Sequence, residues 1–333
     1  MSNPVYSFVI PVHNEEETLG ELYRELAPVL EQLDGPAEVI LVNDGSTDSS
    51  YAVMLQIQDH DSRFKVIDLS RNFGHQVAIT VGLDYVSGDA TVIMDADLQD
   101  PPELVLDMAG RWREGFEIVY GIREVRTEDT WFKRTSARAF YRFLGRVSDV
   151  KLPPDVGDFR LVDRKVVLAI RRLPERARYL RGMFGWVGFK QVGIPYARRA
   201  RIAGTTKYPV GKMIRLATDA LISFSSAPLK LALSFGFVIS GLSFLAGVAA
   251  LILKATGAFT VPGWASIVAG VAFLGGMQLL VLGVMGEYVA RIYDEVKRRP
   301  LYVIRATHGI DAPVIEPLRE PREAPAERDE WVR

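Results

Sequence analysis

The segment "ATVIMDADLQDPPE", residues 90–103, joins a short apolar run to a group of acidic side chains. Ala90–Met94 has the continuous apolar character of a strand that is buried on both faces of a parallel sheet. Asp95, Asp97 and Asp100 follow it, and no Lys or Arg lies among them. Because unpaired carboxylates at the edge of a core are unfavourable, the segment indicates that a cation binds there.

The residues around this segment alternate between short apolar runs and helical patterns. This rhythm predicts an α/β fold with a parallel sheet that is flanked by helices. Ligands of such sheets bind at the carboxyl ends of the strands, which is where "VNDGSTD" (42–48), "SRNFG" (70–74) and "DADLQD" (95–100) fall. The predicted strands are Tyr6–Pro11, Ala37–Asn43, Phe64–Leu69, Ala90–Met94 and Glu117–Ile122, and the predicted helices are Glu16–Leu33, Ser49–His60, His75–Val86 and Pro102–Arg113.

The overall composition excludes several classes of protein. The chain has 333 residues, of which 48% are hydrophobic and 24% charged, with a net charge of −1. This charge argues against a dedicated nucleic-acid binder, which is usually basic. There are no cysteines, so disulfides, thiolate chemistry and cysteine-based zinc sites are excluded. The N-terminal "MSNPVYSFVIPVHN" lacks the basic and long apolar regions of a signal peptide.

Two long uncharged segments, Leu231–Leu253 and Trp264–Met285, lie in the C-terminal third of the chain. At about 1.5 Å per residue, each is long enough to cross a hydrocarbon core of about 30 Å. A pair of buried core helices is the alternative, but such helices seldom run this far without a charge. The short connection 255–263 predicts a helical hairpin. Basic residues flank both ends, which places both termini and the catalytic candidates in the cytosol: Lys207, Lys212, Arg215, Lys230, Arg291, Lys297, Arg298 and Arg299.

The acidic cluster has the composition of a site for Mg²⁺ or Mn²⁺. Asp95 and Asp97 point to one face if strand geometry persists to Asp97, and Gln99 would continue that face. Hard oxygen ligands suit these ions, with a diphosphate completing the coordination. The alternative is a turn whose aspartates cap the next helix. Asp44, at the end of another strand, could accept hydrogen bonds from a nucleobase or ribose, or could belong to an ordinary strand–turn–helix connection.

Two further segments have amphipathic helical patterns. Residues 132–146 place aromatic residues on one side and basic residues on another, as in a helix that lies in an anionic membrane interface. Residues 209–226 form a second candidate that leads into the hairpin. Packing of these helices on the catalytic domain is the alternative. Residues 311–333 are rich in Pro, Glu and Arg, which is typical of a disordered tail.

Five motifs together carry a family resemblance: "VIPVHNEEETL" (9–19), "VNDGSTD" (42–48), "LSRNFG" (69–74), "DADLQDPPE" (95–103) and "GDFRL" (157–161). As a set, they resemble glycosyltransferase family 2, and in particular the polyprenyl-phosphate glycosyltransferases that act on undecaprenyl or dolichyl phosphate. The resemblance covers residues 5 to about 300. It implies a GT-A fold, which is a Rossmann-like, mostly parallel sheet, and an inverting, metal-dependent transfer from a nucleotide sugar to a lipid phosphate.

The resemblance also implies roles for individual residues. The nucleotide would contact Pro11, Asn14, Glu15, Asp44, Arg71, Asp95 and Ala96, and the metal would be held by Asp95, Asp97 and Gln99. Asp158 and Arg160 would lie near the sugar and the acceptor phosphate, and the catalytic residues would be Asp158, Arg160 and Asp97. Asp158 could position the acceptor, act as a base, or form only a structural salt bridge with Arg160 or Arg164.

The acceptor would be a phosphate monoester, which is mostly dianionic at neutral pH and already nucleophilic. Its negative charge must be held by cationic side chains as it approaches an anionic donor. We expect Arg123, Arg134, Arg201 and Lys207 to share this role. Arg201 and Lys207 lie in "RIAGTTKY" (201–208), which resembles the basic loop of the family, with Thr206 in place of the usual serine.

The expected organisation is a cytosolic catalytic domain (1–208), a juxtamembrane amphipathic helix (209–227), two transmembrane helices (228–290), a cytosolic segment (291–310) and a tail (311–333), all in an integral protein of the bacterial inner membrane. UDP-glucose is the first choice of donor, GDP-mannose stays open, and self-association as a tetramer is one option among relatives. A processive synthase would need more helices and a Q-x-x-R-W pattern. A non-catalytic nucleotide-sugar sensor is the alternative from another class, and a transporter is disfavoured because the two spans carry no charge.

Overall fold

The computed structural model describes residues 4–123, 156–176, 178–199 and 263–310, and between them positions 229, 232–239, 241–242, 244–245, 252 and 256. The chain divides into two compact units. The first comprises Met1–Ala96 and Tyr302–Arg333, and the second comprises Asp97–Leu301. The predicted helices at 132–146 and 209–226, the tail at 311–333, and Arg134, Arg201 and Lys207 lie outside the described residues.

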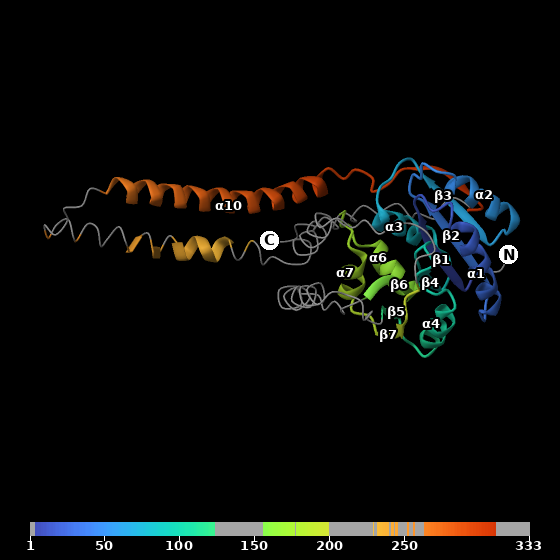
Figure 1. Ribbon diagram of the computed structural model, residues 1–333. Helices are drawn as coiled ribbons and strands as arrows, with labels where there is room; N and C mark the ends of the chain where they lie inside the picture. The colour runs from blue at the N-terminus through green and yellow to red at the C-terminus, as the bar shows by residue number, and fades with distance from the viewer. Residues whose placement is uncertain are drawn as a thin grey trace, which may run out of the picture. The chain divides into compact units, whose positions relative to one another are not determined.

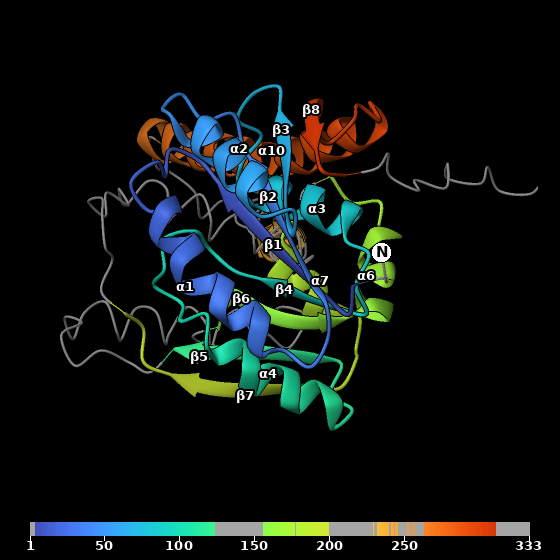
Figure 2. The same cartoon turned by 90° about the vertical axis from the view of Figure 1, so that its right-hand side faces the viewer.

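The first unit contains a sheet with the strand order β4-β1-β2-β3-β8, of which Figure 1 labels β1 to β4 and Figure 2 also labels β8. Neighbouring strands among the first four are parallel, whereas β8 runs antiparallel to β3. The strands of this unit are β1 (Tyr6–Val12), β2 (Ala37–Asn43), β3 (Phe64–Leu69), β4 (Ala90–Ile93) and β8 (Ile304–His308), and its helices are α1 (Leu19–Gln32), α2 (Ser50–His60) and α3 (His75–Tyr85).

The order of these strands fixes where the helices lie. The chain passes from β1 to β2 to β3 in one direction and then returns to β4 on the other side of β1. Because such crossovers are right-handed, α1 and α2 cover one face of the sheet and α3 covers the other, as can be followed in Figure 2. All seven residues of β1 are buried, which explains its continuous apolar sequence.

The second unit contains three strands in the order β7-β5-β6. β5 pairs with β6 in the antiparallel and with β7 in the parallel direction, and helix α4 packs on β5 and β6. The sheet segments of the protein are therefore of mixed direction. The elements of this unit are α4 (Leu104–Arg113), β5 (Ile118–Arg123), β6 (Val156–Asp163), α6 (Arg164–Arg171), α7 (Leu180–Trp186), β7 (Gln191–Tyr196) and α10 (Trp264–Val296).

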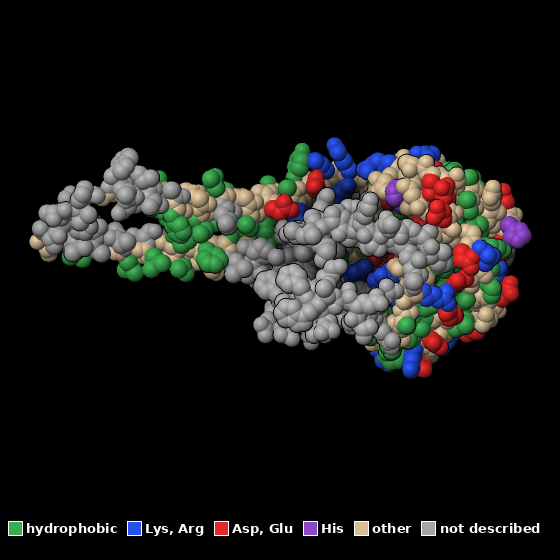
Figure 3. All heavy atoms as spheres, viewed as in Figure 1, with side chains coloured by type: hydrophobic (Ala, Val, Ile, Leu, Met, Phe, Trp, Pro, Cys, Tyr) green, Lys and Arg blue, Asp and Glu red, His purple; other side chains and the backbone are tan. Residues whose placement is uncertain are grey.

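Helix α10 is longer than the predicted segment Trp264–Met285. Its 33 residues correspond to about 50 Å of helix. Among the described residues, α10 is the one helix whose length and composition would allow it to cross a membrane, over Phe273–Val296. The most apolar part of this segment is not buried. Figure 3 shows hydrophobic side chains along α10. Of the other predicted span, Leu231–Leu253, the described positions 232–239, 241–242 and 244–245 are helical.

Candidate active site

In the first unit, the carboxyl ends of β1 and β4 lie side by side at the point where the strand order reverses. Val9 of β1 is paired with Ile93, the last residue of β4. Open α/β sheets bind their ligands at the carboxyl ends of the strands, where the strand order reverses. His13–Glu15 and Asp95 follow these two strands and therefore lie at this edge of the sheet.

The turn after β1 is held by the turn after β2. Asn14 has a left-handed backbone conformation, with φ of +56°, and its Oδ1 accepts a hydrogen bond from the Thr47 backbone N–H at 2.8 Å. In return, the Asn14 N–H donates to Ser46 Oγ at 3.1 Å, and the Glu15 N–H donates to Ser50 Oγ at 2.8 Å. These reciprocal bonds fix Asn14 and Glu15, whereas Pro11 is buried within β1.

Asp44 holds the turn after β3. It is 3% exposed, and its two carboxylate oxygens accept hydrogen bonds from the backbone N–H groups of Phe73 (2.7 Å) and Gly74 (3.0 Å). The same turn carries Arg71, whose guanidinium lies 4.0 Å from the ring centre of Phe73. Asp44 therefore joins the ends of β2 and β3, which is a structural role that its sequence context did not reveal.

His13 makes hydrogen bonds to the turns that follow β2 and β3. Its Nδ1 donates to the Asp44 carbonyl oxygen at 2.9 Å, because a carbonyl can only accept, and its Nε2 then accepts from the Asn72 side-chain amide at 3.1 Å. These partners select the neutral Nδ1–H tautomer. One imidazole thus bridges the turns that follow β1, β2 and β3.

The acidic segment does not continue the strand as expected. β4 ends at Ile93, residues 96–97 form a turn, and Leu98 has a left-handed φ of +53° with its side chain fully buried. The prediction that strand geometry places Asp95, Asp97 and Gln99 on one face is therefore wrong. Burial of Leu98 bends the chain here, and the Gln99 N–H donates to Asp97 Oδ1 at 3.2 Å.

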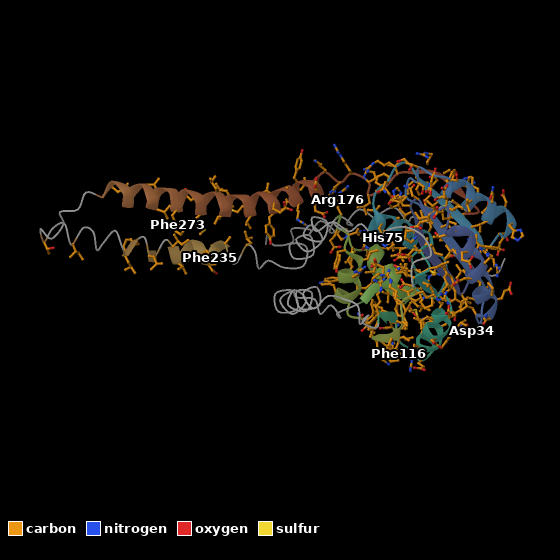
Figure 4. The ribbon with its side chains drawn as sticks, viewed as in Figure 1. Asp34, His75, Phe116, Arg176, Phe235 and Phe273 are labelled. Atoms are coloured by element: carbon orange, nitrogen blue, oxygen red, sulfur yellow. The ribbon has the colours of Figure 1, made fainter. Side chains whose placement is uncertain are left out.

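The first segment of the first unit ends at Ala96, directly after Asp95, and the second unit begins at Asp97. The Asp95 side chain is 27% exposed, and its Oδ1 lies 3.5 Å from Nε2 of His75, the first residue of α3, which Figure 4 labels. Asp97 is 7% exposed. Only the buried Ala96 separates the two aspartates along the chain, so both carboxylates belong to one short acidic segment that follows β4.

The donor atoms of this segment fit a hard divalent cation. Asp95, Asp97 and Gln99 offer two carboxylates and one amide oxygen, which are ligands that Mg²⁺ and Mn²⁺ accept. Within the ranges that the structure describes, no group of three or more His, Cys, Asp or Glu side chains could hold a metal ion. Mg²⁺ usually keeps several waters and is bound through one or two carboxylates together with the phosphates of a substrate.

In the second unit, Asp158 forms a two-armed ion pair with Arg181 of α7. Arg181 Nε lies 2.8 Å from Asp158 Oδ1, and its Nη2 lies 3.0 Å from Oδ2. The sequence offered Arg160 or Arg164 as the salt-bridge partner, and this was wrong, because the guanidinium comes from helix α7. The Asp158 side chain is 8% exposed.

Arg160 places a cation inside the second unit. It is 4% exposed, and it donates to the backbone carbonyls of Gly157 (2.8 Å) and Asp158 (3.2 Å). The guanidinium also lies 4.5 Å from the ring centre of Phe184. Burial lowers the pKa of Arg160 to about 10, so the side chain is still cationic at neutral pH.

Asp100 lies beside one tyrosine and two arginines of the second unit. It is 1% exposed and accepts a hydrogen bond from the Tyr196 hydroxyl, while Arg123 Nη2 lies 3.6 Å and Arg198 Nε 4.0 Å from its carboxylate. Arg123 also donates to the Tyr196 hydroxyl at 3.2 Å. Burial, together with the Asp100 carboxylate, raises the pKa of Tyr196 well above its ordinary value, so this hydroxyl remains protonated.

Comparison with known proteins assigns the family. Residues 7–171 match the family described as glycosyl transferase family 2. The uncharacterized glycosyltransferase YkcC of Bacillus subtilis is 48% identical over 306 residues, which span 92% of this chain and 95% of that protein. The chain belongs to glycosyl transferase family 2. It is therefore a transferase, and its mixed sheet with flanking helices is a GT-A-like fold.

Other relatives in the family have more specific names. The SfII prophage-derived bactoprenol glucosyl transferase of Shigella flexneri is 37% identical over 91% of this chain and 98% of that protein. A prophage bactoprenol glucosyl transferase homolog of Escherichia coli is 36% identical over 90% of this chain and 98% of that protein. A solved glucosyl-3-phosphoglycerate synthase of Mycobacterium tuberculosis has a TM-score of 0.49 at 21% identity, covering 66% of this chain and 78% of that one.

Sequence reasoning missed several side chains that the structure places around the predicted site residues of this family 2 member. They are His75 beside Asp95, Arg181 beside Asp158, and Tyr196 and Arg198 beside Asp100. His75 directly follows the "LSRNFG" motif and could have been included. Arg181, Tyr196 and Arg198 lie in segments without a motif, so only the fold brings them to these positions.

Proposed function

We propose that this family 2 glycosyltransferase transfers glucose from UDP-glucose to polyprenyl phosphate at the cytosolic face of the membrane. An oxygen of the acceptor phosphate attacks the anomeric carbon of glucose, and the bond from that carbon to the UDP oxygen breaks. The products are polyprenyl-phosphate glucose with inverted configuration and UDP. Such a product would serve as a sugar donor for glycan or lipid modification.

One observation carries this proposal, namely the similarity over nearly the whole length of the bactoprenol glucosyl transferase of Shigella flexneri. The matched region covers 98% of that protein, so it reaches beyond the catalytic domain into the apolar C-terminal part of this chain. The two proteins therefore share both the part that would bind the donor and the part that would hold the enzyme at a lipid acceptor.

The nucleotide would bind to the turns that follow β1, β2 and β3. Asn14 and Glu15 are fixed by hydrogen bonds from and to the β2 turn, and Asp44 fixes the turn that carries Arg71. This arrangement supplies a preorganised set of polar groups at the carboxyl ends of β1, β2 and β3, where sheets of this type bind ligands. In this proposal, Pro11 and Ala96 line the pocket, and Asp95 approaches the ribose.

A divalent cation would be held by Asp95, Asp97 and Gln99. When bound, it supplies Lewis-acid neutralisation of the departing diphosphate. The protein itself supplies negative charge for that ion at Asp95 and Asp97, and the bond from the Gln99 N–H to Asp97 Oδ1 orients the second of these carboxylates. Asp97 is proposed as catalytic on this basis.

The acceptor phosphate would meet the cationic side chains of the second unit, together with Arg134, Arg201 and Lys207. Arg123 is oriented for this role by Tyr196 and Asp100, and Arg160 adds a buried positive charge. Of the roles left open for Asp158, its two-armed pair with Arg181 favours positioning, because a guanidinium on both oxygens makes a carboxylate a weaker base.

Helix α10 supports a membrane location. Its large apolar side chains are exposed, as in Phe273 (60%) and Leu279 (72%), whereas a core helix of a soluble domain would bury such residues. Charged residues gather near its C-terminal end, including the Glu287–Arg291 pair. With the basic residues 297–299, they favour a cytosolic position for that end.

The test is transfer of radiolabelled sugar to polyprenyl phosphate by the full-length protein in detergent with Mn²⁺ or Mg²⁺. We expect label that is extractable into organic solvent with UDP-glucose, and none when either the acceptor or the divalent ion is left out. GDP-mannose, assayed in parallel, tests the alternative donor. Transfer from GDP-mannose alone would overturn the choice of glucose, and no transfer from a full panel of nucleotide sugars would overturn the acceptor assignment.

A further inference from the structure

Strand β8 carries an arginine that lies out of register with the strand it pairs with. Ala306 is opposite Asp68 of β3 and Ile304 is opposite Leu69, so Arg305 is an extra residue with no partner at the bulge between them. β-Bulges re-aim side chains and are frequent beside active sites. This bulge directs the Arg305 side chain to the carboxyl end of β3, which is the end that carries the candidate nucleotide site.

Arg305 contacts two groups at that end. Its Nη1 lies 3.2 Å from Oδ2 of Asp68, and its Nη2 donates to the Ser70 carbonyl oxygen at 2.8 Å. The Asp68 side chain is only 1% exposed, whereas that of Arg305 is 61% exposed. Arg305 thus pairs, from the surface, with a carboxylate that is buried in the sheet. A buried carboxylate without a cationic partner would be strongly unfavourable.

From Asp68, a chain of hydrogen bonds crosses the ends of three strands. Asn43 Nδ2 donates to Asp68 Oδ1 at 2.7 Å, and Asn43 Oδ1 accepts from the Ser46 N–H at 3.1 Å. Ser46 Oγ in turn accepts from the Asn14 N–H. Both Asn43 and Asp68 are buried, so the polar atoms of these two side chains depend on their partners in the protein.

The second contact of Arg305 leads to the same site by another path. Ser70 begins the turn whose Phe73 and Gly74 N–H groups bind the Asp44 carboxylate, and this turn also carries Arg71. Arg305 therefore contacts the start of one nucleotide-site turn directly, and it reaches the other two turns through Asp68 and Asn43.

We propose that Arg305 is a positioning residue for the nucleoside diphosphate, which it does not itself contact. This inference rests on the proposed function, because the nucleotide pocket is assigned there. Arg305 acts by fixing the turns that hold Asn14, Asp44 and Arg71, so its removal should weaken binding of the donor.

β8 has other attachments that do not involve Arg305. The Tyr302 hydroxyl donates to Asp84 at 3.0 Å, the Ser70 N–H donates to the Val303 carbonyl at 2.9 Å, and the Tyr51 hydroxyl lies 3.0 Å from His308 Nε2. The backbone pairing of four β8 residues with β3 also remains. An Arg305 variant is therefore expected to keep the strand in place, which makes the effect on the site separable from unfolding.

The experiment compares Arg305→Ala and Arg305→Lys with Thr307→Ala in full-length protein in detergent. Thr307 is an exposed residue of the same strand, opposite Ile67 and away from the bulge, so Thr307→Ala is the matched control. The measurements are the dissociation constant of UDP, the KM of UDP-glucose and of polyprenyl phosphate, and hydrogen exchange of the backbone amides.

Loss of charge-assisted hydrogen bonds predicts an increase of about tenfold in the UDP dissociation constant and in the UDP-glucose KM for Arg305→Ala. Arg305→Lys keeps the positive charge but lacks the forked N–H donors of the guanidinium. It should therefore recover part of the lost affinity for UDP. The KM of polyprenyl phosphate should stay within about twofold, as should all constants of Thr307→Ala. Faster amide exchange is expected at Asn14, Ser46, Phe73 and Gly74, and not in β1.

Unchanged UDP affinity and unchanged exchange in Arg305→Ala would overturn the inference. An equal rise of both KM values with faster exchange throughout the sheet would also overturn it, because it would show general destabilisation. If the unsubstituted protein bound no nucleotide, the proposed function would fail, and the exchange at the three turns would still decide whether Arg305 positions them.

Discussion

The Arg181 guanidinium holds both carboxylate oxygens of Asp158, at 2.8 and 3.0 Å, and thereby joins helix α7 to strand β6. Asp158 lies in the "GDFRL" motif, but its partner lies in a segment that has no recognisable signature. The pair shows how a residue expected to work near the acceptor depends on one that the motif does not contain.

Arg181→Ala tests this dependence. Without its partner, the Asp158 side chain, which is 8% exposed, can turn away, and misplacement of this kind lowers kcat by about 100-fold. Arg111→Ala removes a comparable but exposed pair with Glu114 and should change kcat by less than about twofold. Steady-state transfer assays give both values, and an unchanged kcat in Arg181→Ala would show that Asp158 needs no positioning.

Asp97→Ala should abolish transfer while the protein remains folded. Asp97 is proposed to hold the divalent ion, and its removal leaves Asp95 as the one carboxylate of the proposed ligand set. Asp107→Ala, at an exposed residue in the first turn of α4, removes a carboxylate of the same kind as a control. Thermal unfolding and Mn²⁺ titration of both variants accompany the assay. Normal turnover by Asp97→Ala would count against the metal assignment.

Tyr196→Phe should lower the free energy of unfolding by about 1–2 kcal/mol, because the buried Asp100 carboxylate then loses a hydrogen bond. It should also loosen Arg123, which donates to the same hydroxyl, and so raise the KM of the acceptor phosphate by a few-fold. Tyr293→Phe, on the exposed side of α10, serves as the control. If the KM of the acceptor phosphate equals that of the unsubstituted protein, Arg123 does not take part in binding the acceptor.

A pH-dependent contribution to stability is expected from Glu38. Burial by itself would raise the pKa of this carboxyl, but hydrogen bonds from Lys65, Ser7 and Ser87 outweigh it and lower the pKa below its ordinary value of 4.5. A lowered pKa in the folded state means that the stabilisation is complete above pH 4.5 and is lost as the pH falls through the folded value.

Glu38→Gln should therefore destabilise the protein by about 1.5–3 kcal/mol at pH 7, and the difference should shrink below pH 4.5. Thermal unfolding of both proteins between pH 7 and pH 3 measures this. A difference that stayed constant over that range would assign the stabilisation to packing and not to the charge of Glu38.

Periodicity predicted the first unit closely because its strands are buried on both faces and its helices have one apolar side. β2 and β3 have the predicted bounds, and α2 and α3 differ by one residue at one end. β8 was missed because an edge strand of five residues with alternating exposure has little apolar signal. Its assignment requires the antiparallel pairing with β3, which a single segment of sequence does not contain.

The site was predicted less completely than the fold. Asp44 was proposed as a site residue because of its type and its place at a strand end, and Asn14 and Asp158 were proposed because of the family resemblance. Motifs could not identify the partners that orient these residues, since those partners come from distant segments. The bend at Leu98 was also missed, because a buried leucine with positive φ has no sequence signature.

The pairing of β8 with β3 has a practical consequence for truncation. A chain that stops after α10 would lose the cover over one side of β3 and expose its unpaired N–H and C=O groups. Exposed edges of this kind recruit strands from other molecules and lead to aggregation. Removal of the last thirty or so residues to improve solubility would therefore have the opposite effect, whereas shortening that spares His308 keeps the edge closed.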